Sequence, residues 1–173
     1  MKIIRYYTDA IFYHYTDFKG RASRSEFWFF MLIDALLFAT TLIMDTLVLD
    51  IPWVTDDPMI LDYFTLTLSN VHWWATLLPS TAILTRRLHD VGQSGWLQLL
   101  FIIPWVGALI IDFVDEDNTI LVVVFLLAAI LGSIVLTVLN VIDSQKGSNR
   151  YGPNPKEKPV DDAPARPPAG AAQ

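Results

Sequence analysis

The chain has 173 residues, of which 53% are hydrophobic and only 17% are charged, with 12 Lys and Arg against 18 Asp and Glu. A mean hydropathy of +0.42 with so little charge excludes an ordinary soluble domain, which is about one-quarter charged. The absence of Cys excludes disulfides, Cys-based zinc sites and a cysteine nucleophile, and the net charge of −6 argues against nucleic acid as a partner.

Residues 1–26 are expected to form a cytoplasmic interfacial segment. Apolar residues recur in it at helical spacing, and charged residues lie between them. The apolar residues are Ile3, Ile4, Tyr7, Ile11, Tyr15 and Phe18. This pattern predicts an amphipathic helix that lies on the membrane surface.

Four long apolar runs follow, and each predicts a transmembrane helix because about 20 apolar residues cross the hydrocarbon core. The membrane domain, residues 27–142, has predicted spans at about 27–49, 63–85, 94–113 and 119–142. A chain of this length has no soluble core large enough to bury four such helices. The expected fold is therefore an all-α integral membrane protein, a four-transmembrane-helix bundle with an N-terminal interfacial helix.

The distribution of charge predicts the topology. All 12 Lys and Arg residues lie before the first span, between the second and third, or after the fourth, whereas the loops 50–62 and 112–117 carry acidic residues without basic ones. The positive-inside rule therefore places both termini in the cytoplasm. There, 143–155 is a turn-rich motif segment, and the Pro/Ala-rich tail 156–173 is expected to be disordered.

Polar side chains inside the predicted spans share helix faces and form a predicted polar seam. By helix rise, His72 lies about 7 Å deeper than Asp34, so we expect no direct contact between them, whereas Thr76 and Ser80 lie at a better depth for Asp34. The seam is either a path for a proton, ion or small solute, or a set of hydrogen bonds that holds the helices together. Its members are Asp34, Thr41, Asp45 and His72.

Three segments at the predicted cytoplasmic side are rich in charged and turn-forming residues, namely GRASRSEFW (20–28), RRLHDVGQSGW (86–96) and residues 143–155. Ser23 or Ser25 is expected to cap the first span, with Glu26 at its positive end. The charged residues are expected to converge, either as ion pairs that lock the helix ends or as a pocket for a phosphate-bearing headgroup or an acidic partner segment, which Arg suits. This group comprises Arg21, Arg24, Arg86, Arg87, His89, Asp90 and Arg150.

These motifs carry a family resemblance. GRASRSEFW, RRLHDVGQSGW, IPWVG (103–107) and GSNRYGPNP (147–155), in this order and spacing, resemble the YhaH-like bacterial inner-membrane family, domain-of-unknown-function family 805, over about residues 6–155. The resemblance implies a small multi-pass protein of the bacterial inner (plasma) membrane. It implies no activity, substrate or catalytic residue.

An enzymatic interpretation has little support in the sequence. The string Gly92-Gln93-Ser94-Gly95 matches the G-x-S-G string of rhomboid-like intramembrane proteases. However, His72 is more than about 10 Å deeper by helix rise, and His89 lies in the same loop as Ser94, so neither is placed to act as its base. The three His residues show no metal-ligand spacing, and no P-loop or dinucleotide motif occurs, so no cofactor or metal is expected.

The leading expectation is a non-enzymatic inner-membrane protein. Its basic cytoplasmic face would engage membrane lipids through their anionic headgroups, or a membrane protein partner or second copy. The alternative is a small transporter or channel subunit that uses the polar seam and oligomerises, since four spans are few for a transporter.

Overall fold

The computed structural model describes residues 2–47, 67–114 and 118–157, and every regular element in these ranges is helical. The predicted all-α class is therefore confirmed. The acidic loop 50–62 and the tail from residue 158 onward lie outside the described residues. The elements are α1 (Lys2–Phe12), α2 (Arg24–Leu47), α4 (Leu68–Asp90), the 3₁₀ helix η1 (Gly95–Gln98), α5 (Leu99–Val114) and α6 (Thr119–Val141).

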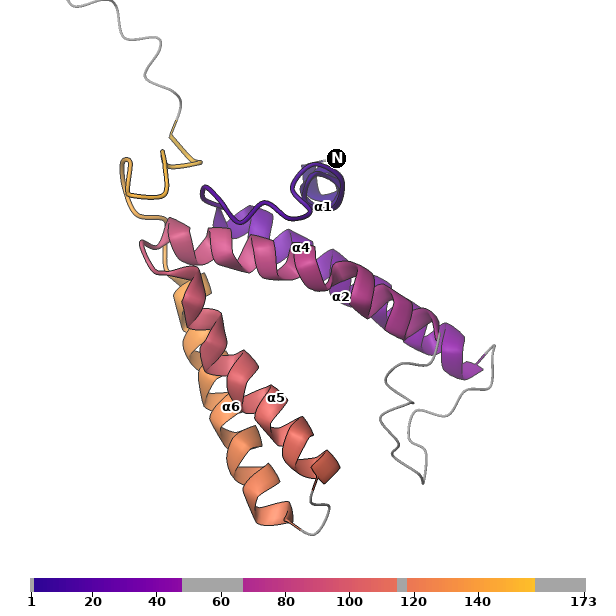
Figure 1. The fold of residues 1–173 in the computed structure, drawn as a ribbon. Helices are drawn as coiled ribbons and strands as arrows, with labels where there is room; N and C mark the ends of the chain where they lie inside the picture. Colours follow the sequence, from indigo (N-terminus) through magenta and orange to yellow (C-terminus); the bar gives the residue numbers. More distant parts are fainter. Residues whose placement is uncertain (1, 48–66, 115–117, 158–173) are drawn as a thin grey trace, which may run out of the picture.

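The long helices form two antiparallel pairs that diverge from a common end (Figure 1). One pair is α2 with α4 and the other is α5 with α6, and α1 crosses the first pair. The compact four-helix bundle that we expected is therefore not formed. Apolar side chains gain little by leaving lipid for one another, so helices in a membrane associate mainly where small or polar residues bring them together.

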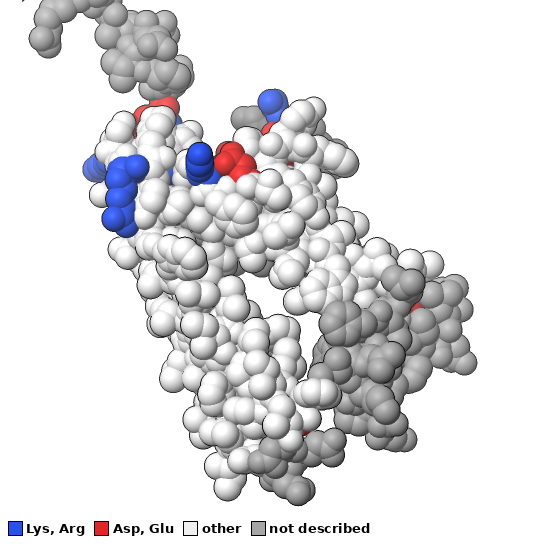
Figure 2. Space-filling model, viewed as in Figure 1, with Lys and Arg blue, Asp and Glu red and all other residues white. Residues whose placement is uncertain are grey.

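Charged side chains gather where the two pairs meet. This charged end comprises α1, the start of α2, the end of α4 and residues 143–157. Figure 2 shows basic and acidic side chains there, above long helical sides that are largely uncharged. Such a distribution is typical of a protein whose apolar sides face lipid and whose charged end faces water.

Three of the helices are long and apolar enough to cross a membrane. They are Arg24–Leu47, Gly95–Val114 (η1 with α5) and Thr119–Val141. The helix α4 has 23 residues but is less apolar than these three, because it contains Asn70, His72 and the basic residues of its last turns. The chain is therefore a membrane protein, and a fourth span at α4 stays a prediction.

Local sequence explains where α2 and α4 begin. Ser23 and Glu26 form a capping box, since the Glu26 N–H donates to Ser23 Oγ at 3.3 Å and the Ser23 N–H donates to Glu26 Oε2 at 2.7 Å. Of the two predicted caps of the first span, Ser23 therefore fills that role. The start of α4 is capped from α2, where the buried Asp45 accepts from the N–H groups of Leu68 and Ser69 at 2.9 and 2.7 Å.

The helix α1 docks on α2 and α4 through aromatic and small residues. Tyr7 stacks on Phe30 with ring centroids 5.2 Å apart, and Tyr6 stacks on Phe29 at 6.2 Å. Ala10 is buried in the small core that these helices share. The α1 helix is thus held by specific packing, which fixes its position over the ends of α2 and α4.

Helix α5 packs closely on α6 at two glycines. Pro104 lacks an N–H, so it leaves the carbonyl of Leu100 without its helical donor. Gly132 of α6 lies directly against that carbonyl, and a Cβ at position 132 would come within 2.2 Å of the oxygen. A Cβ at position 107 would likewise clash with the ring of Phe125. The residues of the IPWVG segment therefore serve close helix packing.

Candidate functional site

A buried ion cluster joins the motif segments at the charged end. Asp90 accepts from Arg21 Nε at 2.9 Å and pairs with Arg87 through its other carboxylate oxygen. The side chains of Arg87 and Asp90 are completely buried, and that of Arg21 is 1% exposed. Two cations around one buried carboxylate are stable only if their remaining N–H groups also find acceptors.

Backbone carbonyls at the end of α6 and in the residues that follow it supply those acceptors. Arg21 donates to the carbonyls of Gln145 at 2.6 Å and Gly147 at 2.8 Å. Arg87 donates to the carbonyls of Asn140 at 3.2 Å and Ile142. The cluster therefore ties the end of α4 to the last turn of α6 and to the residues that follow it.

This burial decides between two interpretations for three of the predicted site residues. Arg21, Arg87 and Asp90 do converge, but they are enclosed and their polar atoms contact protein groups. They form ion pairs at the helix ends, which is the first of the two arrangements that we expected for this group.

Two further predicted residues also have protein partners. Arg24 pairs with Asp143 at 3.1 Å and donates to the Val141 carbonyl at 3.0 Å. The ring of His89 stacks on Tyr151 with centroids 3.7 Å apart, and its Nδ1 lies 3.2 Å from the carbonyl oxygen of Gly20.

The exposed side chain of Arg150 lies over the ring of Tyr151, with its guanidinium carbon 4.7 Å from the ring centroid. Partial burial lowers the pKa of His89, and the charge of Arg150 lowers it further, although the hydrogen bond to Gly20 opposes both effects. The lowered pKa favours the neutral form of His89, whose ring packs between the motif segments.

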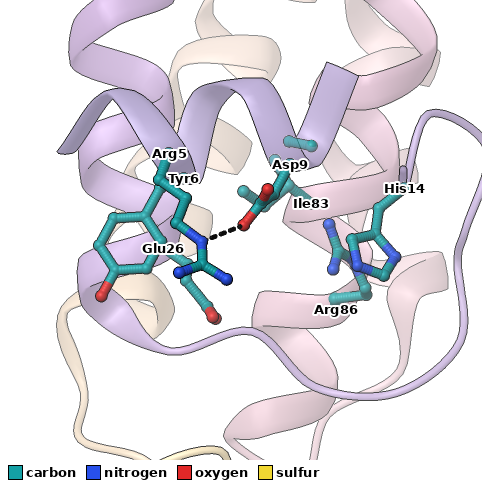
Figure 3. A pocket seen from close by; sticks show the side chains of 8 residues that line it. Arg5, Tyr6, Asp9, His14, Glu26, Ile83 and Arg86 are labelled. Carbon is teal, nitrogen blue, oxygen red and sulfur yellow. Dashed lines mark ion pairs between the residues drawn. The ribbon is translucent and has the colours of Figure 1, made fainter. Parts of the chain in front are cut away.

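Arg86 differs from these residues because it lines a pocket. The pocket has a volume of about 350 Å³ and lies beneath α1, between the first turn of α2 and the end of α4. That volume is within the range of about 300–1,000 Å³ that small-ligand sites occupy. Its lining includes Arg5, Tyr6 and Asp9 of α1, His14, Glu26 of α2 and Arg86 of α4 (Figure 3).

The guanidinium of Arg86 is not satisfied by the protein. Its Nε atom is buried and has no hydrogen-bond partner in the described part of the chain. Burial lowers the pKa of Arg86, while the charges of Asp17 and Glu26 oppose this effect and favour its cationic form. Arg86 is therefore a basic residue of the pocket wall whose Nε donor is left unused by the described part of the chain.

The polar seam differs from our prediction in its central contact. His72 Nε2 lies 3.3 Å from Asp34 Oδ1, so the expectation that these residues do not meet is wrong. The predicted depths refer to the expected inner ends of the two spans, but the Ala22 N–H donates to the Arg86 carbonyl, which sets Ala22 and Arg86 at the same level. From that pair, Asp34 is twelve residues along and His72 is fourteen, a difference of only about 3 Å.

The remaining seam residues serve other contacts. The Thr41 hydroxyl donates to the carbonyl of Phe38 in its own helix at 2.8 Å. Asp45 caps α4, as described above. The hydroxyl of Tyr7, from α1, donates to Asp34 at 3.4 Å. Of the four predicted seam residues, the structure therefore brings Asp34 and His72 together, next to Tyr7 of α1, whereas Thr41 and Asp45 make separate contacts.

Ser94 has a structural contact of its own. Its Oγ accepts from the Trp96 N–H at 3.4 Å at the start of η1. The imidazole of His89, in the last turn of α4, contacts the Gly20 carbonyl. The G-x-S-G string is thus part of the turn that leads from α4 into η1.

The pocket includes residues that the sequence analysis did not select. Arg5 and Asp9 are paired at 3.5 Å, and His14 pairs with Asp17 at 3.1 Å. The signal for the first pair was present, since opposite charges four residues apart share one face of a helix. The position of this face over Arg86 depends on how α1 docks, which the sequence does not specify.

The chain is similar to a known family and to two curated proteins. Residues 15–153 match the family described as "Protein of unknown function (DUF805)". The chain is 31% identical to "Inner membrane protein YhaI" of Escherichia coli (strain K12) over 148 residues, 85% of this chain and 92% of that protein. It is 30% identical to "Inner membrane protein YhaH" of the same strain over 146 residues, which are 84% of this chain and 93% of that protein. No solved structure matches the chain.

Proposed function

We propose that this chain, which belongs to the DUF805 family, is a four-span inner-membrane protein that binds a phospholipid headgroup in the pocket beneath α1. The proposed role is binding and not catalysis. The names of the relatives YhaI and YhaH support the inner membrane as its location. The placement of all Lys and Arg on one side of the proposed spans supports cytoplasmic termini.

The length of α4 supports the fourth span. Its 23 residues extend about 34 Å, and the hydrocarbon core is about 30 Å thick. Two of its polar residues have a partner on α2, since His72 and Thr76 both contact the carboxylate of Asp34. The proposed span therefore covers residues 68–85, which extend about 27 Å and nearly match the hydrocarbon core, and residues 86–90 at the end of α4 belong to the charged end.

The depth of the pocket suits a headgroup. Trp28 and Trp96, which are 42% and 78% exposed, flank the charged end, and exposed Trp concentrates at the membrane–water interface. Glu26, on the pocket wall, precedes Trp28 by two residues. This spacing supports a pocket at the level of the lipid phosphates.

The observation that carries the proposal is the unpartnered Nε of Arg86. A buried donor without an acceptor costs about 1–3 kcal/mol, and more when it is charged, so a movement of the Arg86 side chain that brings this donor to a ligand oxygen in the pocket is favourable. A phosphate suits a guanidinium because two of its oxygens align with two N–H groups. A phospholipid presents such a group at this depth.

Native mass spectrometry of the full chain, extracted gently from its own membrane, tests this proposal. We expect a retained phospholipid in the wild type, loss of most of it in Arg86→Gln, and partial recovery in Arg86→Lys. Arg150→Gln is the matched control, because it removes an exposed arginine outside the pocket. Equal lipid retention in Arg86→Gln and the wild type would contradict headgroup binding, and a bound protein mass would favour a partner or a second copy.

A second candidate function rests on the contact between Asp34 and His72. Ionisable residues within membrane spans are costly and commonly mark ion or proton paths. A small transporter or channel subunit built on this cluster predicts that Asp34→Asn abolishes a flux in proteoliposomes and leaves lipid retention unchanged. A variant that only lowers thermal stability in detergent would make the cluster structural.

A further inference from the structure

The pocket beneath α1 carries charges of both signs. In Figure 3, Arg86 and His14 lie at one end of it and Arg5 and Glu26 at the other, with Asp9 between them. A purely anionic ligand that binds Arg86 therefore also meets carboxylates. This pattern is unlike a basic patch, which attracts any anion.

The acidic side chains have capacity for a cation. Glu26 accepts from the Ser23 N–H through one carboxylate oxygen, Oε2. Asp9 pairs with Arg5, but the side chain of Arg5 is 80% exposed and the pair spans 3.5 Å. Such an exposed pair contributes little, so an incoming ammonium displaces Arg5 at small cost.

We infer that the pocket selects a zwitterionic aminophospholipid headgroup, with its phosphate against Arg86 and its primary ammonium against Asp9 and Glu26. This inference rests on the proposed function and adds the class of headgroup. A primary ammonium donates three hydrogen bonds to the carboxylates. A choline headgroup has no N–H to donate, and a glycerol headgroup has no cation, so both lose this second contact.

The geometry favours an extended headgroup of this kind over a compact anion. Arg86 and Glu26 come from different helices and line opposite ends of one pocket of about 350 Å³. A phosphate and an ammonium joined by a short linker bring both charges to such a pair of ends. A free phosphate satisfies Arg86 alone.

The test uses the full chain in nanodiscs that contain equal amounts of phosphatidylethanolamine, phosphatidylcholine and phosphatidylglycerol with identical acyl chains. Lipids that stay bound after release are identified by native mass spectrometry. We expect phosphatidylethanolamine to be enriched about tenfold over each of the others, the ratio that hydrogen bonds to a charged group support. Equal retention of the three lipids, or enrichment of phosphatidylglycerol, would overturn the inference.

Two variants separate this inference from the proposed function. Asp9→Asn with Glu26→Gln removes both carboxylate charges, and Gln retains the capping role of Glu26. We expect this variant to keep its bound lipid and lose the preference for phosphatidylethanolamine, and an unchanged preference would count against the inference.

Arg86→Gln is expected to lose all three lipids. If Arg86→Gln keeps them, the proposed function fails; if it loses them but the wild type shows no preference, only the inference fails. Asp9→Asn alone, whose side chain caps no helix, replaces the double variant if that variant does not fold.

Discussion

The hydroxyl of Tyr15 donates to the carbonyl of Ala75 at 2.6 Å, and Pro79 leaves that same carbonyl without its helical donor. The proline would disturb α4, and a residue from the segment after α1 supplies the missing hydrogen bond. The contact fixes the segment that connects α1 to α2 against the side of α4. It thereby helps hold α1 in place above the pocket.

Tyr15→Phe is expected to lower the free energy of unfolding by about 1 kcal/mol, because it leaves the Ala75 carbonyl without a donor. In a Pro79→Ala background the helix supplies its own N–H, so the same change is expected to cost much less. A double-mutant cycle by thermal unfolding in detergent measures this coupling. Tyr13→Phe, at a side chain that is 79% exposed, is the control. An identical cost in both backgrounds would disprove the role of Pro79.

Gly132→Ala is expected to separate α5 from α6 at a cost of about 1–3 kcal/mol, because the added methyl group meets the rigid backbone of Leu100. Gly107→Ala meets the side chain of Phe125, which can be made smaller. Phe125→Leu is therefore expected to restore stability to Gly107→Ala but not to Gly132→Ala. Unfolding measurements on the single and double variants test this difference, and rescue of both glycine variants by Phe125→Leu would refute it.

Asp90→Asn is expected to destabilise the chain by about 3–5 kcal/mol, because it leaves Arg21 and Arg87 as buried cations without their counter-charge. Arg24→Gln breaks an exposed pair with Asp143 and is expected to cost about 0–1 kcal/mol. Denaturation in mixed detergent compares the two variants. Similar small losses in both would show that the Asp90 cluster does not hold the charged end together.

Stability is expected to fall as the pH is lowered below the ordinary pKa of His, 6.5, because the pKa of His89 is lowered in the folded chain. The folded state then binds fewer protons than the unfolded state. The stabilisation from His89 is therefore complete above pH 6.5 and is lost as the pH falls through and below that value. Melting temperatures between pH 8 and pH 5 test this for the wild type and His89→Gln. A slope that is the same in both would assign the pH dependence to other groups.

The sequence was sufficient for the class of fold and the family. Long uncharged runs and the lack of alternation favoured a helical membrane protein, and the order of the motifs indicated the family. The cap at Ser23 could also be predicted, because a Ser followed three residues later by Glu is a local signal. Such features depend on short stretches of chain.

The sequence was not sufficient for the relation between helices. The contact between Asp34 and His72 depends on which residues of α2 and α4 lie at the same level. The ends of the predicted spans do not specify this level, which the hydrogen bond between Ala22 and Arg86 sets. The full burial of Arg87 could not be told from the partial burial of Arg86, since adjacent residues of a helix face different neighbours. Both errors concern register and docking, which are set by contacts between distant parts of the chain.

The proposed headgroup binding in the pocket depends most on a direct contact between Arg86 and a lipid phosphate. Magnetisation transfer between ¹⁵N-labelled arginine side chains and lipid ³¹P, measured by solid-state NMR in proteoliposomes, detects such contacts. We predict an arginine–phosphorus signal in the wild type that Arg86→Gln removes and that Arg150→Gln retains. Spectra that are identical for the wild type and Arg86→Gln would contradict the proposed binding.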